Sequence, residues 1–418
     1  MTNPPPPLTN DCFAMPQGAY WTPVEDALTH LRANIGVVTG TKKIAITRAD
    51  GRILAADVTA LRSHPPTPNS AVDGYGFAGP AMAGLTEMPL LDGRSAAGAP
   101  FDGRVPDGHA IRVLTGAALP SGVDTIVLQE DIAIEGNTLR FHGPLKAGAN
   151  ARRAGEDMTA GQIILHAGHQ MSAADIGMLA AAGVGHVTVH KRLRVGILST
   201  GDELAQAGQA ARADQIYDAN RPMLAAAIRR WGHKLVDLGR APDNRAALGD
   251  ILTDAANRCD VILTSGGASA GDEDHMSALL QDTGSFALWR IAMKPGRPLA
   301  MGLWAGTPVL GLPGNPVAAM VCALIFARPM LCAMAGGGWV VPQPIPLPAA
   351  FDKSKKEGRR EYLRAKLVDG QVHAFTSEGS GRVSGLSWAG GLVELPDRAM
   401  SVKNGDTVRF YPYASFGL

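Results

Sequence analysis

Cysteine is scarce in this chain of 418 residues, and no two cysteines are close in sequence. The four cysteines, Cys12, Cys259, Cys322 and Cys332, form no C-x-x-C motif. The sequence therefore indicates neither a disulfide framework nor a cysteine-based zinc site. The eleven histidines show no spacing typical of metal ligands either. Both absences suit a reducing compartment, and we expect a cytoplasmic protein.

An excess of one charge is also missing. The 39 Lys and Arg residues nearly balance the 38 Asp and Glu residues, so no overall field attracts nucleic acid or an anionic membrane. Any specificity for an anion must then come from a local group of side chains. The composition, 46% hydrophobic and 18% charged, is that of a folded protein, and the length predicts several domains.

Segments that would target the chain to a membrane are not indicated. Residues 1–10 are rich in proline and have no basic region before an apolar one, so we predict a disordered tail over residues 1–20. Residues 317–335 are apolar except Arg328 and approach the ~20 residues that a bilayer requires. Pro329 interrupts this run, because proline breaks the hydrogen bonding inside a helix. We predict a buried, kinked helix in a soluble protein.

The chain alternates between β-rich and α/β patterns. Residues 23–34 and 172–182 have helical patterns, with Ser172 as an expected N-cap, and residues 52–157 have the short apolar runs and turns of a β-rich region. From residue 194 strands and helices alternate, which predicts a Rossmann-like parallel α/β domain. The predicted strands are 195–198, 234–238, 261–264 and 308–311, and the predicted helices are 220–231, 245–258 and 274–281.

The end of the chain has a third pattern. Prolines at 342, 344, 346 and 348 indicate an extended linker. Glycine-rich turns follow, with a hairpin signal at residues 405–409, and predict a C-terminal β-barrel or sandwich.

Four glycine-bearing loops follow the predicted strands: those at Gly201, Gly266-Gly267, Gly296 and Gly314. Ligands of open α/β sheets bind beyond the carboxyl ends of the strands. Glycine lets backbone N–H groups approach an anion closely, and a helix N-terminus adds its positive dipole end. One such loop alone is more often a plain turn, but four at one edge predict an anion site.

Charged side chains gather at the same edge. The acids are Asp202, Glu203, Asp243, Asp272, Glu273 and Asp274; Asp272 and Glu273 also suit helix capping. The cations are Arg290, Lys294 and Arg297, and their spacing places Arg290 and Lys294 on one face of a strand, either in the site or facing solvent. Acids beside a phosphate-binding loop repel the ligand unless Mg²⁺ lies between them. The edge therefore predicts a site for a polyanion and Mg²⁺.

Polar turns of the β-rich region provide a second set of candidates. Asp73 lies among turn-forming residues at 68–76, Thr115 in a turn with Gly116, and Asp157 at the end of the polar stretch 152–157. Each also suits a surface loop. The basic run at residues 353–360 indicates a solvated hairpin tip or a contact for an anionic ligand tail.

These blocks, in this order, resemble the molybdopterin molybdenumtransferase family (MoeA and the gephyrin E domain). The resemblance covers nearly the whole chain after residue 20. It rests on residues 69–75, 114–117, 152–157, 199–204, 215–218, 265–274, 294–298 and 313–316. The last four blocks are similar in molybdopterin adenylyltransferases, which lack the β-rich region.

The resemblance implies an elongated subunit of four domains after the tail, working as a homodimer with shared active sites. The expected domains are a linker and dimerisation domain (21–61 and 160–190), a β-rich domain (62–159), a Rossmann-like molybdopterin-binding domain (191–338) and a C-terminal β-barrel (339–418). The implied reaction inserts molybdenum from molybdate into adenylylated molybdopterin with Mg²⁺ and releases AMP, the final step of molybdenum cofactor biosynthesis. Transient contacts with the adenylyltransferase and with molybdenum enzymes are also implied. An adenylyltransferase activity and a non-catalytic, gephyrin-like scaffold are the alternatives.

The family's site residues carry over by position. The catalytic set is Asp73, Thr115, Asp157, Glu203, Asp243, Asp274 and Lys294, with Glu203 and Asp274 as Mg²⁺ ligands. The substrate-binding set is Ser199, Thr200, Gly201, Asp218, Ser265, Gly266, Gly267, Arg290, Gly296, Arg297, Pro313, Gly314, Asn315 and Pro316. Arg290 and Arg297 stand where the family usually has lysine, which keeps the charge. Ala268, Ala270 and Pro396 also depart from the usual residues.

Overall fold

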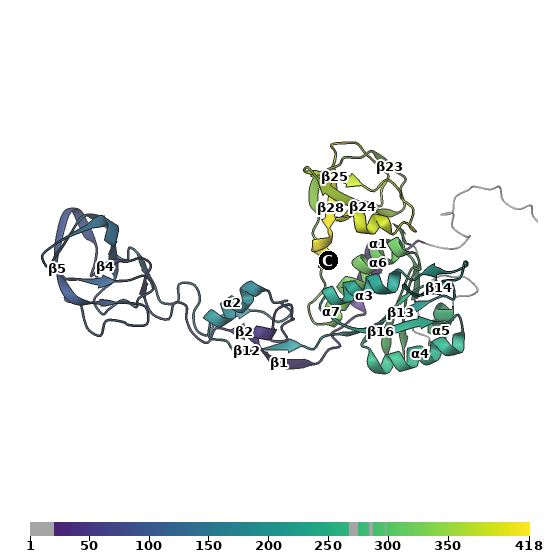
Figure 1. Cartoon of the computed structure of the whole chain (residues 1–418), viewed down its shortest axis with the longest axis horizontal. Helices are drawn as coiled ribbons and strands as arrows, with labels where there is room; N and C mark the ends of the chain where they lie inside the picture. Colours follow the sequence, from purple (N-terminus) through teal and green to yellow (C-terminus); the bar gives the residue numbers. More distant parts are fainter. Residues whose placement is uncertain (1–20, 267–274, 284–286, 297) are drawn as a thin grey trace, which may run out of the picture. The chain divides into compact units, whose positions relative to one another are not determined.

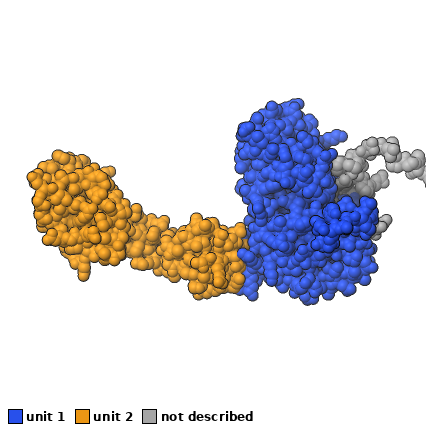
Figure 2. Space-filling view, in the orientation of Figure 1, with its two compact units in different colours: residues 1–41, 190–418 blue, residues 42–189 orange. Residues whose placement is uncertain are grey.

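This computed structural model describes residues 21–266, 275–283, 287–296 and 298–418. The predicted tail and the candidates Gly267, Asp272, Glu273, Asp274 and Arg297 lie outside the described residues. The chain divides into two compact units (Figure 2). The first is Lys42–Val189, and the second combines Met1–Thr41 with His190–Leu418.

The unit Lys42–Val189 has a small mixed core and a β domain (Figure 1). The core packs Leu54, Leu179 and Val189 together with the helix α2 (Ala173–Ala181). Ser172 caps α2 in a capping box with Asp175, which confirms the predicted N-cap. The strands of this part are β1 (Thr41–Ala45), β2 (Val58–Thr59), β11 (Ile163–Leu165) and β12 (His186–His190).

The predicted β-rich region is confirmed. Its main sheet has the strand order β7-β4-β6-β5-β9-β8. These strands are β4 (Gly74–Phe77), β5 (Ala81–Ser95), β6 (Ala110–Val113), β7 (Thr125–Leu128), β8 (Ile132–Glu135) and β9 (Thr138–Leu145), and β3 (Asn69–Ser70) pairs with β10 (Ala151–Arg152) beside them. Apolar residues at alternate positions, such as Ile111, Val113 and Ile126, fill the core on one side.

The predicted Rossmann-like domain is also confirmed. Four parallel strands run in the order β16-β13-β17-β21: β16 (Lys234–Ala241), β13 (Arg194–Thr200), β17 (Val261–Ser265) and β21 (Thr307–Leu312). The helices are α3 (Asn220–Arg230), α4 (Arg245–Arg258) and α5 (His275–Asp282). β17 is buried along its whole length, as expected for a strand covered on both faces.

Two strands at one side of this sheet were not predicted. β20 (Pro298–Trp304) pairs antiparallel with β21, and β18 (Ala287–Arg290) pairs antiparallel with β20. The hairpin between β20 and β21 turns at Ala305 and Gly306, both with positive φ, which the right-handed twist of a two-residue hairpin favours. The sheet is therefore mixed at this side.

The long apolar segment forms a buried helix, as predicted. α6 (Pro316–Cys322) continues through the π-helical turn Ala323–Ala327 into α7 (Arg328–Met334). Among the described residues this is the one helix long and apolar enough to cross a membrane, and 83% of its most apolar window is buried inside the protein. Pro329 does not end the helix: the π turn before it changes the hydrogen-bond register.

The C-terminal part is β-rich, as predicted, and packs with the helix α1 (Val24–Ala33) in the same unit. Its sheet has the order β19-β24-β26-β28-β22, with β25 beside β24. The elements are β19 (Met293–Lys294), β22 (Ile345–Pro348), β23 (Lys353–Lys355), β24 (Arg360–Val368), β25 (Gln371–Ala374), α8 (Ser384–Trp388), β26 (Gly391–Leu395), β27 (Met400–Val402) and β28 (Thr407–Pro412).

Two details of this part differ from the predictions. The second half of the predicted proline linker is the edge strand β22, where proline is tolerated because one side of the strand needs no donor. The prediction of a hairpin at residues 405–409 is wrong. β27 pairs with β23, whereas β28 pairs with β26 and β22, so the turn joins strands of different sheets.

Candidate functional site

Three of the four predicted glycine loops lie side by side at the carboxyl edge of the Rossmann-like sheet. The register pairs Ser199 with Ser265 and Ser265 with Leu312, so β13, β17 and β21 end together. Gly201, Gly266 and Gly314 follow these ends, and the Gly266 N–H donates to the Leu312 carbonyl at 3.2 Å. The parallel strands thus bring the loops together, as the sequence predicts.

Glycine is required in the loop after β17. Gly266 has a φ of +91°, which residues with a side chain rarely adopt. A Cβ there would lie 2.8 Å from Thr200 Oγ1 and 3.0 Å from the Thr200 carbonyl oxygen. The loops after β13 and β17 are therefore too close for a side chain between them.

Buried polar atoms at this edge are left without partners. Asn220, at the start of α3, donates from Nδ2 to Ser265 Oγ at 2.7 Å and to the Gly314 carbonyl at 2.6 Å. Within the described residues, Ser199 Oγ, Asn220 Oδ1 and Asn315 Oδ1 have no hydrogen-bond partner. Buried polar atoms are rarely left unpaired, so these are candidate ligand contacts. The sequence predicted Ser199 and Asn315 but missed Asn220, which appeared only as the start of a helix.

The fourth loop reaches the same edge from an antiparallel strand. β20 runs against β21, so its first residue, Pro298, lies at the carboxyl edge, and Arg290 pairs with it. Gly296 precedes this strand with a φ of +102°, and a Cβ there would lie 3.0 Å from Cys322 Sγ of α6. Arg290 and Gly296 therefore both belong to this edge.

The prediction that Arg290 and Lys294 share a strand face is wrong. Arg290 ends β18, whereas Lys294 belongs to β19 and pairs with Glu361 of β24 in the C-terminal sheet. The buried residues 291 and 292 separate the two strands. Period-2 spacing holds only within one strand, and here the chain passes from one sheet to another.

Two predicted acids lie around the loop after β13. The Glu203 carboxylate folds back over Gly201: a Cβ on Gly201 would lie 2.3 Å from Glu203 Oε2. Asp243, which follows the neighbouring strand β16, accepts from the Asp202 N–H at 3.1 Å. Asp202 Oδ1 lies 3.6 Å from Arg240 Nη1. The short strands β14 (Leu204–Ala205) and β15 (Ile216–Tyr217) continue this loop.

Oxygen donors for a hard cation are present here, but the predicted pair is only partly described. Glu203 lies at the loop, and Asp274 is outside the described residues. In the ranges that the structure describes, three or more potential ligands do not converge at any point. Carboxylates and waters are the ligands that Mg²⁺ prefers, so Glu203 fits the role as one ligand of a partly hydrated ion.

Asp218 has a structural contact. Its carboxylate accepts from the Arg221 N–H at 3.1 Å and from Arg221 Nε at 3.3 Å, and only 7% of the residue is exposed. Arg221 also contacts Asp237 at 2.9 Å. The sequence predicted Asp218 as a binding residue, whereas this network fixes the first turn of α3.

Asp73 and Thr115 contact each other in the β domain. The antiparallel register pairs Gly74 with Val113, so Asp73 lies beside the turn that carries Thr115. The Thr115 N–H and hydroxyl both donate to Asp73 Oδ1, at 2.6 and 2.7 Å. The backbone hydrogen bond first, and then the hydroxyl, hold the pKa of Asp73 below its ordinary value. This predicted pair is therefore positioned as an anionic, half-buried carboxylate.

Asp157 is in the same unit but outside this pair. It is exposed, and its N–H donates to the His64 carbonyl at 3.1 Å. The described residues show no side-chain contact from Asp157 to Asp73 or Thr115. The three candidate residues Asp73, Thr115 and Asp157 all belong to the unit Lys42–Val189. Glu203 and Lys294 belong to the other unit.

Lys294 forms an ion pair that the sequence did not predict. Its ammonium group contacts Glu378, and Lys353 contacts the same carboxylate. Lys353 was expected on a solvated hairpin tip, but its side chain is only 16% exposed. Lys355 is likewise buried and donates to the carbonyls of Pro396 and Arg398 at 2.8 and 3.0 Å. No local pattern marks Glu378, which is distant from both lysines in sequence.

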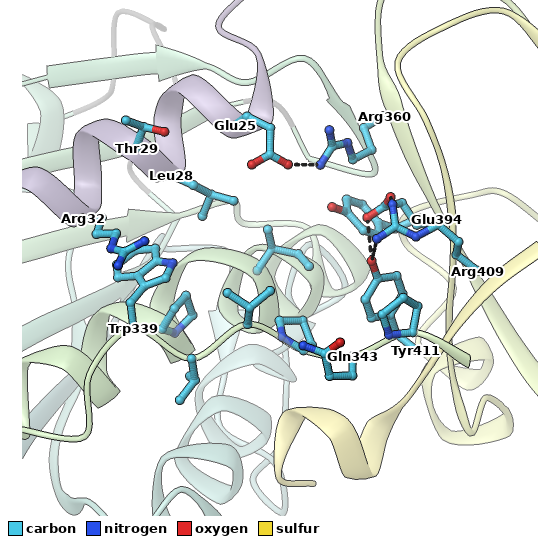
Figure 3. A pocket seen from close by; sticks show the side chains of 17 residues that line it. Glu25, Leu28, Thr29, Arg32, Trp339, Gln343, Arg360, Glu394, Arg409 and Tyr411 are labelled. Atoms are coloured by element: carbon cyan, nitrogen blue, oxygen red, sulfur yellow. Dashed lines mark hydrogen bonds and ion pairs between the residues drawn. The ribbon is translucent and has the colours of Figure 1, made fainter. Parts of the chain in front are cut away.

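A further pocket of about 380 Å³ lies between α1, the apolar helix and the C-terminal sheet (Figure 3). Glu25 of α1 pairs with Arg360 at 2.6 Å across its mouth, and Glu394 pairs with Arg409 at 2.7 Å. Trp339 and Tyr411 supply aromatic surface. None of the predicted site residues that the structure describes is among the residues lining this pocket.

Sequence comparison matches three parts of the chain to known family models. "MoeA N-terminal region (domain I and II)" matches residues 22–183, "Probable molybdopterin binding domain" matches 196–333, and "MoeA C-terminal region (domain IV)" matches 346–413. A molybdopterin molybdenumtransferase of Haemophilus influenzae is 32% identical over 93% of this chain and 98% of its own. Molybdopterin molybdenumtransferase 2 of Mycobacterium tuberculosis is 34% identical over 88% of this chain and 94% of its own.

Solved structures agree with the sequence comparison. The molybdopterin biosynthesis MoeA protein of Pyrococcus horikoshii OT3 matches with a TM-score of 0.83 and 26% identity, over 94% of this chain and all of that chain. Each of these matches covers nearly the full length of the relative. The similarity therefore includes the β-rich region, the Rossmann-like domain and the C-terminal part. The chain therefore belongs to the molybdopterin molybdenumtransferase (MoeA) family.

Proposed function

We propose that this protein inserts molybdenum from molybdate into adenylylated molybdopterin and releases AMP, the last step in making molybdenum cofactor. Membership of the molybdopterin molybdenumtransferase family supports this function. The observation that carries it is the carboxyl edge of the sheet, where glycine loops and the unpartnered atoms of Ser199, Asn220 and Asn315 meet. Backbone N–H groups in such loops suit a phosphate, and buried amides and hydroxyls suit a pterin or a nucleotide.

Three predicted cations, Arg290, Lys294 and Arg297, are proposed to hold the oxyanions. Lys294 and Arg297 would bind molybdate and phosphate oxygens, with Arg290 at the carboxyl edge of the sheet adding positive charge. Arginine and lysine both pair well with oxyanions, and arginine can do so through two parallel hydrogen bonds. Their main contribution is to position the reacting groups and to balance negative charge.

Glu203 and Asp274 are proposed to hold Mg²⁺, with Asp243 orienting the loop of Glu203 through the Asp202 N–H. A bound Mg²⁺ would neutralise charge on the pyrophosphate group. Asp73, kept ionised by Thr115, and Asp157 are proposed to orient the oxyanion or a water from the β domain. The cytoplasm is the proposed location, and a homodimer with shared sites is the proposed assembly.

One assay tests this function. The full chain is incubated with adenylylated molybdopterin, Mg²⁺ and molybdate, and AMP is measured over time. We expect AMP release that depends on molybdate. Consumption of ATP with pyrophosphate release would instead indicate an adenylyltransferase, and no turnover with either substrate would contradict the enzymatic proposal.

A further inference from the structure

One carboxylate joins two lysines from different strands of the C-terminal sheets. Lys294 of β19 contacts Glu378 Oε2, and Lys353 of β23 contacts Glu378 Oε1. The side chains of Lys294 and Lys353 are 24% and 16% exposed, so water screens this cluster only in part. Each oxygen of the carboxylate thus has its own ammonium partner.

We propose that Lys353 and Lys294 form a two-cation subsite for a tetrahedral oxyanion, and that the Glu378 carboxylate occupies this subsite until the anion displaces it. The inference deepens the proposed function, because it assigns a second cation and a competing group to the oxyanion site of Lys294. Molybdate and the phosphate of a nucleotide share the required chemistry: each presents two oxygens along an edge, as a carboxylate does.

The space at the cluster favours displacement over simultaneous binding. With the Glu378 side chain in place, the cavity lined by Lys294, Glu361, Ser377 and Glu378 has a volume of about 20 Å³. That is room for roughly one water molecule. An oxyanion with four oxygens therefore fits only after the Glu378 side chain has moved.

The backbone on both sides of Glu378 is fixed by hydrogen bonds to Arg364, whereas the contacts that hold its side chain are the ion pairs with Lys294 and Lys353. Arg364, itself only 5% exposed, donates to the carbonyls of Ser377 and Gly379, and at 2.8 Å to that of Arg382. The Glu378 side chain is 43% exposed. Rotation about its side-chain bonds can therefore release the carboxylate into water without moving the segment.

Both lysines have a contact with Glu361 of β24 that remains when the Glu378 side chain moves away. Lys353 Nζ lies 3.5 Å from Glu361 Oε2, and the Lys294 backbone pairs with Glu361 in the β19–β24 ladder. Without Glu378, the Glu361 carboxylate still lies beside Lys353, whereas the Lys294 ammonium group loses its ion-pair partner, so positive charge becomes available to an incoming anion. Burial raises the pKa of Glu378, but the hydrogen bonds from Lys294 and Lys353 outweigh it and keep the pKa below its ordinary value. The competing group is thus an anion at neutral pH.

Equilibrium binding on the full-length protein tests the subsite directly. Isothermal titration measures the affinity of the wild type and of Glu378→Gln for sodium molybdate and, separately, for inorganic phosphate. We expect Glu378→Gln to bind molybdate about tenfold more tightly or better, because a neutral amide competes poorly for two cations. Lys353→Met in the Glu378→Gln background should lose that gain, and Lys353→Arg should keep it. If phosphate alone shows the gain, the subsite holds the nucleotide phosphate.

Glu357→Gln is the matched control: it removes the same charge from an exposed position of the same domain and should leave both affinities unchanged. Equal or weaker oxyanion binding by Glu378→Gln would overturn the inference, as would a gain that survives Lys353→Met. Absence of binding by every variant at millimolar anion would also overturn it. AMP release is measured in parallel, so a failed assay with a tighter Glu378→Gln variant contradicts the proposed function but keeps the subsite.

Discussion

Individual residues of the site differ in how firmly their local surroundings hold them. Asp73 has two donors from one neighbour, and Asp243 accepts from a backbone N–H. Among the residues that the structure describes, Lys294 instead has a single ion-pair partner, Glu378, whose own side chain is half-exposed. We therefore expect the acids to be pre-positioned and Lys294 to exchange its partner when a ligand binds.

Thr115→Val should raise the pKa of Asp73 without restoring it to the ordinary value. The variant loses the hydroxyl donor at 2.7 Å but keeps the backbone N–H, which has the larger effect. Because hydrogen bonds depress this pKa, protonation of Asp73 begins at a higher pH in the variant when the pH falls. Carboxyl NMR titration measures the shift. Thr115→Ser keeps a hydroxyl and should titrate like the wild type; a pKa unchanged in Thr115→Val would show that the hydroxyl has no influence.

Lys294→Ala should raise the molybdate concentration needed for half-maximal turnover by roughly tenfold or more, since a hydrogen bond to a charged group contributes about 1.5–3 kcal/mol. Nucleotide affinity should change less, because the glycine loops remain. The measurement is AMP release at varied molybdate, together with AMP binding. Lys403→Ala, which removes an exposed lysine outside the proposed site, is the control. An unchanged molybdate requirement would assign Lys294 to the phosphate or remove it from the site.

At the scale of single elements, local sequence decides where two of the helices, α2 and α4, begin. α2 shows this clearly, because Ser172 accepts from the Asp175 N–H while Asp175 accepts from the Ser172 N–H, the reciprocal pattern of a capping box. α4 begins with a simpler N-cap, in which the Asn244 side chain accepts from the Ala247 N–H at 3.0 Å. In both helices the capping residue and the residue that it bonds lie within four residues of each other, so the cap can be found from the sequence.

Ser172→Ala should destabilise the first turn of α2 by about 1 kcal/mol. Hydrogen exchange of a peptide covering Ala173–Ala181 should then be roughly fivefold faster, while peptides from the Rossmann-like domain exchange as before. Ser121→Ala is a suitable control, because Ser121 is exposed and its hydroxyl has no hydrogen-bond partner within the described residues. Equal protection of α2 in both variants would contradict a role for the cap.

At the scale of the whole molecule, the candidate residues belong to two compact units. Asp73, Thr115 and Asp157 are in Lys42–Val189, and Glu203 and Lys294 are in the unit that contains His190–Leu418. A two-fold dimer can supply one set of residues from each partner. Under the proposed assembly, each active site is therefore shared between subunits.

Mixing inactive Asp73→Ala with inactive Lys294→Ala protein, after dissociation and re-pairing, should then restore activity. In each mixed dimer one site collects both changes and the other is intact. With equal mixing, random pairing makes about half of the dimers mixed, so about a quarter of the wild-type sites return. Native mass spectrometry verifies the re-pairing. Mixed dimers without recovered AMP release would contradict shared sites.

Much of the fold follows from local patterns in the amino-acid sequence. Helix ends, the alternation of strands and helices, and the glycine loops after β13, β17 and β21 follow from signals within a few residues, so they were predictable. Parallel pairing then makes the ends of these strands neighbours, which is why Ser199, Ser265 and Gly314 could be placed at one edge.

The contacts that join distant segments could be found only from the three-dimensional packing of the chain. The pairing of Lys294 with the C-terminal sheet, the bond of Asn220 to two loops, and the position of Glu378 between two lysines depend on strand registers that no local pattern encodes. A period-2 rule failed at Arg290 and Lys294 because the chain changes sheets between them. Local chemistry sets which elements form, whereas long-range packing and pairing set which side chains meet.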